Sequence, residues 1–124
     1  MNEYTVKVYP NGNKEWYLNG KLHREDGPAV EWADGVKLWY LNDKLHREDG
    51  PAIERANGDK EWYLNGKLHR EDGPTVEWAD DVKLWYLNGV KMTEEEHQAA
   101  INPVKELTVA EIEKLLGHKV KIAK

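Results

Sequence analysis

The sequence predicts a mainly β fold, an antiparallel array of β-hairpin repeats followed by a small C-terminal helical or α+β cap. Three features lead to this prediction: a 23-residue period, strand-forming segments separated by turn dipeptides, and a tail whose pattern becomes helical. The 124 residues are enough for one small domain or one short array. We expect residues 1–89 to form the array and residues 90–124 to form a cap or a docking segment.

The period is carried by two motifs that recur in steps of 23 residues. The motif WYLN begins at Trp16, Trp39, Trp62 and Trp85. The motif HREDGP begins at His23, His46 and His69. Residues 14–42 and 60–88 differ at only two positions, which indicates duplication of a 46-residue block. Units of this length bury a continuous core by stacking on one another, so the repeat predicts an array.

The strands are predicted from composition and from the turn signals between them. Each repeat holds two segments rich in Trp, Tyr, Leu and Val, which favour β-strands. Asp34-Gly35 and Asn57-Gly58 separate such segments, and these dipeptides favour two-residue type I′ hairpins. Pro10-Asn11-Gly12 indicates one more hairpin at the start. We expect about eight strands in residues 3–88, with Gly27-Pro28 and its copies interrupting the strand pairing.

The register follows from the assumed two-residue turn. A loop of Asp34 and Gly35 would place Val30 opposite Trp39, and Val30 and its copies would then separate the repeated tryptophans. The same register places Arg55 opposite Lys60, a like-charge pair that does not favour the sheet. Because strand side chains alternate in direction, the tyrosines of WYLN are expected on the face opposite to its tryptophans.

The tail after residue 89 is predicted to be helical. Thr93 with Glu96 forms a capping-box pattern, which predicts a helix over 93–101 that ends at Asn102-Pro103. Thr108 with Glu111 predicts a second helix that runs to Leu116, with Gly117 after its last turn. The alternation in 118–124 predicts a half-buried strand. The tail would cap the open end of the sheet, because a bare sheet edge invites aggregation; the alternative is a separate docking arm.

Two resemblances follow from these patterns. The unit W-Y-x-N-G-K-x-H, continued by Gly-Pro and a hairpin turn, resembles a MORN repeat over residues 3–89, in a variant with Arg24, Arg47 and Arg70 after the histidines. This resemblance implies an elongated sheet that binds proteins, dimerises or contacts lipids. The stretch ELTVAEIEKLLGHKVKIAK resembles C-terminal segments of small proteins of tailed bacteriophages, which implies a phage-encoded protein that acts inside a bacterium.

The composition excludes several kinds of chemistry. There is no cysteine and no serine, so disulfides, zinc-thiolate sites and serine nucleophiles are excluded. The net charge is -5 with the two signs interleaved, which disfavours nucleic acid as a general partner. The N-terminus lacks a signal-peptide pattern and no apolar run is long enough to span a membrane, so we expect a cytoplasmic protein, in the bacterial host if phage-encoded.

Candidate binding residues come from the repeated positions. Tyrosine offers apolar area and a hydroxyl at low entropic cost, and arginine offers charge. The predicted partner-binding residues are Tyr17, Tyr40, Tyr63, Tyr86, Arg24, Arg47, Arg70 and Arg55. Arg55 replaces the tryptophan of the other repeats, and we interpret it as a notch for an acidic group, with surface drift as the alternative.

The HRED clusters admit a structural and a functional interpretation. In the structural one, each arginine pairs with an acidic residue of the next loop, and each histidine bonds a loop carbonyl before Gly-Pro. In the functional one, the clusters form a charged ridge that recognises a partner. Metal binding is not predicted, because equivalent histidines lie about 9–10 Å apart in a sheet of normal spacing. A catalytic site is not predicted either, because a site used once would not be copied three times.

These observations predict a non-enzymatic protein-binding module without cofactor. Its partner would be another protein, a bacterial defence protein if the chain is phage-encoded, or a second copy of itself. One alternative is a protein that sequesters a small molecule such as a nucleotide, although no glycine-rich phosphate cradle is present. Another is a dimerisation or peripheral lipid-binding module of the MORN kind; the acidic balance argues against anionic membranes.

Overall fold

A computed structural model describes residues 3–103 and 106–118 and confirms a mainly β fold with two short C-terminal helices. The main sheet contains β1 (Tyr4–Val8), β2 (Lys14–Leu18), β3 (Lys21–Leu22), β4 (Val30–Glu31), β5 (Lys37–Leu38), β8 (Ile53–Glu54), β9 (Lys60–Glu61), β12 (Val76–Glu77), β13 (Lys83–Leu87) and β14 (Val90–Met92). Two small sheets are formed by β6 (Tyr40–Leu41) with β7 (Lys44–Leu45), and by β10 (Tyr63–Leu64) with β11 (Lys67–Leu68). The helices are α1 (Glu94–Ile101) and α2 (Val109–Leu116).

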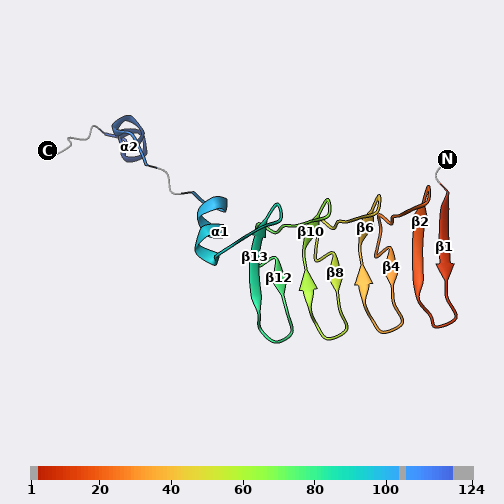
Figure 1. Ribbon diagram of the computed structural model, residues 1–124. Coiled ribbons are helices and arrows are strands. Elements are labelled where there is room, and N and C mark those ends of the chain that lie inside the picture. Colours follow the sequence, from red (N-terminus) through yellow and green to blue (C-terminus); the bar gives the residue numbers. More distant parts are fainter. Residues whose placement is uncertain (1–2, 104–105, 119–124) are drawn as a thin grey trace.

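The repeats stand side by side in chain order. Every pairing in the described residues is antiparallel, and the main sheet runs β1-β2-β4-β5-β8-β9-β12-β13-β14, with β3 beside β2. Figure 1 shows the resulting row of hairpins, with the hairpin turns along the lower edge, β1 at one end and α1 at the other. Equivalent points in neighbouring repeats are therefore two strands apart, or about 9.5 Å.

All eight expected strands are present, but the strands are more divided than expected. The pairing is interrupted at Trp39 and Trp62, which separates β5 from β6 and β9 from β10. The segment that leads from β2 to Gly27-Pro28 begins with a tight hairpin that was not predicted, because Leu18 pairs with Lys21. Asn19 and Gly20 have φ values of 52° and 79°, as a type I′ turn requires. The same hairpin recurs after each WYL segment.

The predicted register is wrong by one residue. The turn at Asp34-Gly35 is a three-residue loop, because the amide of Trp32 bonds to the carbonyl of Val36 and Gly35 has a φ of 98°. Such a loop combines a type I turn with a glycine bulge. As a result Val30 pairs with Leu38 and not with Trp39, so it does not separate the tryptophans.

The corrected register also removes the expected like-charge pair of Arg55 and Lys60, because the amide of Arg55 bonds to the carbonyl of Asp59. Glu54 lies opposite Lys60, and Ile53 lies opposite Glu61. Opposite charges across a strand pair favour the sheet. The guanidinium of Arg55 bonds to the Glu61 carboxylate, 2.5 Å away, so the unusual Arg55 is neutralised within its own repeat.

The two faces of the array differ in what they bury. We call the face with Trp16, Trp39, Trp62 and Trp85 the tryptophan face, and the face with Tyr17, Tyr40, Tyr63 and Tyr86 the tyrosine face. Ala29, Ala52 and Thr75 are fully buried, and Val30, Ile53 and Val76 are almost so. The core is thus a narrow line along the middle of a one-layer sheet. Trp32 lies on the tyrosine face, because it is two residues after Val30, and Val30 pairs with Glu15, two residues before Tyr17. Trp78 is its copy, and both side chains are about two-fifths exposed.

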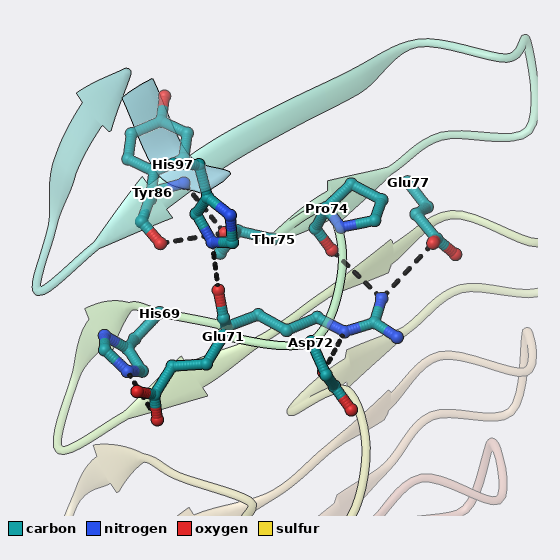
Figure 2. Close-up of polar contacts among 9 residues, drawn as sticks. His69, Glu71, Asp72, Pro74, Thr75, Glu77, Tyr86 and His97 are labelled. Atoms are coloured by element: carbon teal, nitrogen blue, oxygen red, sulfur yellow. Dashed lines mark hydrogen bonds and ion pairs between the residues drawn. The ribbon is translucent and has the colours of Figure 1, made fainter. Parts of the chain in front are cut away.

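The first helix covers the C-terminal end of the array. Both predicted capping boxes are present, at Thr93 with Glu96 and at Thr108 with Glu111, and Gly117 ends α2 in the left-handed conformation. His97 of α1 is fully buried and its Nε2 donates to the carbonyl of Arg70 at 2.6 Å (Figure 2). Figure 1 shows α2 standing away from the array. The predicted strand at 118–124 lies outside the described residues except for His118.

Neither described helix is long and apolar enough to cross a bilayer.

Candidate functional site

Each HREDGP loop is held together by its arginine. The Nε of Arg24 donates to Asp26 at 3.0 Å, and its Nη1 donates to the carbonyl of Pro28 and to Glu31. The guanidinium also lies over the ring of Trp16, 3.9 Å from the ring centre, as a cation–π contact. Arg47 and Arg70 repeat the same contacts. The arginines therefore pair within their own repeat, and the expected ladder to the next loop is wrong.

The glycine of the motif packs closely against the guanidinium of the arginine. A Cβ at Gly50 would lie 2.8 Å from the guanidinium carbon of Arg47, and Gly27 and Gly73 meet their arginines in the same way. A larger residue at this position would force the guanidinium, the far end of a flexible side chain, to move. The loop sequence thus encodes a rigid local structure, with the arginine side chain about one-fifth exposed.

The histidines join neighbouring repeats. The Nδ1 of His23 accepts the backbone N–H of Asn42 at 3.0 Å, and His46 and His69 bond in the same way to Asn65 and Asn88. The partner is an amide of the next repeat and not the loop carbonyl that we expected. Because Nδ1 is the acceptor, the proton of the neutral ring is on Nε2.

The acidic residues of the loops face solvent in a row. Glu25, Asp26, Glu48, Asp49, Glu71 and Asp72 have side chains that are 69% to 88% exposed, and we call them the acidic ridge. The aspartates bind the arginines, and the hydrogen bond from Arg70 lowers the pKa of Asp72. The glutamates lie 3.5 to 3.7 Å from the histidine Nε2 atoms, too far for a strong hydrogen bond, so their carboxylates stay available.

Two grooves alternate with the loops of the acidic ridge. The first has a volume of about 720 Å³ and lies between the loops at 24–28 and 46–49, with Trp39 and Leu41 in its wall. The second has a volume of about 620 Å³ and lies one repeat further on, with Trp62 and Leu64. Each groove therefore combines an apolar wall with carboxylates from two loops at its rim.

The tyrosines lie on the other face. Tyr17 and Tyr63 donate their hydroxyls to Glu15 and Glu61, while Lys7 covers the ring of Tyr17 at 4.7 Å. Burial raises the pKa of Tyr40 and Tyr63 above the usual value of 10.0. The structure thus separates the predicted site residues: the three HRED arginines are on the tryptophan face, and Arg55 pairs with Glu61 beside Tyr63.

The acidic residues belong to the charged ridge that the sequence predicts as an alternative, but the predicted binding residues include the HRED arginines without them. The sequence holds a further signal for the acidic pair. HREDGP is lost in the fourth repeat, yet Glu94 and Glu95 occupy the positions 23 residues after Glu71 and Asp72. They are exposed in the first turn of α1, where they also favour the helix dipole. The fourth repeat thus keeps the acidic pair but lacks the histidine and the arginine that precede it in HREDGP.

Among the described residues no three acidic or histidine side chains are placed to hold a metal ion. Comparison of the chain with protein-family models, with curated proteins and with solved structures yields no significant match.

Proposed function

We propose that this chain is a non-enzymatic protein-binding module whose binding face is the acidic ridge with its two grooves. The observation that supports this most is the repetition of a groove with a tryptophan wall and a carboxylate rim at successive repeats. Aromatic walls supply contact area at low entropic cost, and exposed charges select the partner.

The loops suit binding because they are fixed before a partner arrives. Each arginine is held by two carboxylates, a carbonyl and a tryptophan ring, and each histidine bonds to the next repeat. A preformed surface loses little conformational entropy on association, which favours affinity. The array would act by covering a surface of its partner.

The resemblances noted above extend the proposal. A MORN-variant array encoded by a tailed phage would bind and block a host protein, such as a defence protein, in the bacterial cytoplasm. Nucleotide sequestration gains less support, because the arginine donors are largely used within each loop.

The test is affinity capture from bacterial lysate with three versions of the protein. The first is wild type, and the second is the ridge variant Glu25→Gln, Glu48→Gln, Glu71→Gln. The third, the turn variant Asp34→Asn, Asp80→Asn, Asp81→Asn, removes the same charge at the hairpin turns and keeps side chains that suit turns. Both variants should melt within a few degrees of wild type.

We expect a stoichiometric protein that is captured by wild type and by the turn variant but lost by the ridge variant. Equal capture by all three versions would place binding elsewhere on the array. Absence of any stoichiometric protein from every lysate, including that of a matched host, would contradict the protein-binding function.

A further inference from the structure

We infer that the acidic ridge binds an extended cationic segment, in polyproline II conformation, with lysine or arginine at every third residue. This inference rests on the proposed function and specifies the chemistry of the partner. It follows from the charge of the ridge, from its spacing and from the walls of the grooves.

The charge is the first step. Each arginine of the loops is already bonded to two carboxylates, such as Asp26 and Glu31 for Arg24, so it cannot neutralise the glutamate beside it. Among the described residues, the group that pairs with Glu25, Glu48 or Glu71 is a histidine Nε2 at 3.5 to 3.7 Å, and the glutamate side chains are at least 69% exposed. The outer surface of the ridge therefore presents uncompensated negative charge. A complementary partner carries positive charge at matching points.

The spacing is the second step. Successive glutamates of the ridge belong to repeats that are two strands apart in the sheet, which is about 9.5 Å. A polyproline II helix rises about 3.1 Å per residue with three residues per turn, so its every third side chain recurs on one side after about 9.3 Å. A β-strand would place every second side chain on one side at about 6.7 Å, and an α-helix every seventh at about 10.5 Å. The polyproline II conformation fits the ridge best.

The groove walls are the third step. Trp39 and Leu41 line the first groove and Trp62 and Leu64 line the second, between the acidic loops. Proline-rich segments dock on aromatic-lined grooves, and their fixed conformation reduces the entropy lost on binding. Because Arg47 and Arg70 cover one face of the Trp39 and Trp62 rings, the prolines would contact Leu41, Leu64 and the parts of these rings that the arginines leave open. A segment with two prolines before each cation would then place its cations on the glutamates. In the sequence, Glu94 and Glu95 continue the 23-residue period of the acidic pairs into the first turn of α1.

The experiment uses the full chain and two peptides of equal composition. The in-register peptide consists of four Pro-Pro-Arg triplets. The control peptide, Pro-Arg-Pro-Arg-Pro-Arg-Pro-Arg-Pro-Pro-Pro-Pro, has the same length and charge with arginine at every second position. Binding is measured by calorimetry at low ionic strength, where exposed charges are least screened.

We expect the in-register peptide to bind wild type about tenfold more tightly than the control peptide, a difference that loss of one or two cation contacts would produce. The ridge variant should lose this preference, and the turn variant should keep it. Equal affinity for the two peptides would overturn the spacing argument, because it would show attraction by net charge alone. No binding of either peptide would overturn the cationic partner.

The two proposals fail in different ways. If neither peptide binds but lysate capture still depends on the ridge, the partner chemistry is wrong and the protein-binding function stands. If lysate capture does not depend on the ridge, the face assigned to binding is wrong whatever the peptides do.

Discussion

At the scale of single residues, the repeat is most informative where one copy departs from the others. The third residue of the hairpin loop is Gly12, Gly35 and Gly58 in three hairpins, and all three have φ values of 95° to 98°. In the last hairpin the position is Asp81, with a φ of 70°. An aspartate in this region is strained relative to glycine.

Asp81→Gly should therefore stabilise the protein, by about 0.5–1 kcal/mol. Gly58→Asp should cost about the same, because a Cβ at Gly58 meets its nearest neighbour, Ala79, at 3.8 Å. Gly35→Asp should cost more, since a Cβ there would lie 2.9 Å from the Cβ of Ala56. Urea unfolding of the three variants checks this order. Destabilisation by Asp81→Gly would contradict the strain at this turn.

At the scale of elements, the last repeat needs a cover that the inner repeats obtain from their neighbours. The inner repeats bond through the histidines, as from His46 to Asn65, but the fourth repeat has no HREDGP loop. Instead His97 of α1 bonds to the Arg70 carbonyl, and Thr75 bonds through its hydroxyl to both backbone groups of Tyr86 (Figure 2). Ala29 and Ala52 stand at the equivalent positions of Thr75. The end of the array thus has its own polar contacts.

His97→Ala should destabilise the protein by about 2–3 kcal/mol, because it removes a buried hydrogen bond and leaves a cavity. Gln98→Ala is the matched control, since Gln98 is an exposed neighbour on the same helix. Thermal unfolding of both variants measures the difference. Equal stability of the two would show that α1 does not cover the array.

The capping box of α1 predicts an acid-sensitive helix. Hydrogen bonds from Thr93, the backbone bond above all, hold the pKa of Glu96 below its ordinary value of 4.5. A carboxyl whose folded-state pKa is lowered stabilises the fold above its ordinary pKa, and this contribution is lost as the pH falls through the folded-state value. Circular dichroism between about pH 6 and pH 3 should show this loss. Glutamine at this position keeps an acceptor for the capping box but does not titrate. The Glu96→Gln variant should therefore lack the part of the acid-induced loss of helix signal that comes from Glu96.

At the scale of the whole molecule, the array is modular because each repeat contacts its neighbours through the same bonds. Deletion of residues 14–59 joins Asn13 to Lys60 and preserves the register, because residues 14–42 and 60–88 are nearly identical. The shortened chain should unfold cooperatively with a smaller denaturant dependence, since it exposes less surface. It should also lose the peptide preference, because the first groove, one of the two loops that line the second groove, and two acidic pairs are removed. A non-cooperative transition would contradict this modular account.

The fold class, the period, the eight strands and both capping boxes could be predicted because each depends on local sequence. The register could not, because Asp34-Gly35 is compatible with a two-residue or a three-residue loop and only the hydrogen bond from Trp32 to Val36 decides. The hairpin at Asn19-Gly20 could have been predicted from this dipeptide alone, because Asn-Gly favours a two-residue hairpin turn. The acidic character of the ridge could not be predicted, because it depends on which carboxylates each arginine binds. The packing of the folded loop decides this.

The most direct test of the central claim uses the tryptophans as reporters of the binding face. Trp39 and Trp62 line the grooves, whereas Trp32 and Trp78 are exposed on the tyrosine face. In an NMR titration with the in-register peptide, we expect the indole N–H signals of Trp39 and Trp62 to move in proportion to saturation, while those of Trp32 and Trp78 stay in place. Movement of Trp32 and Trp78 with the groove signals unchanged would show that the partner uses the opposite face.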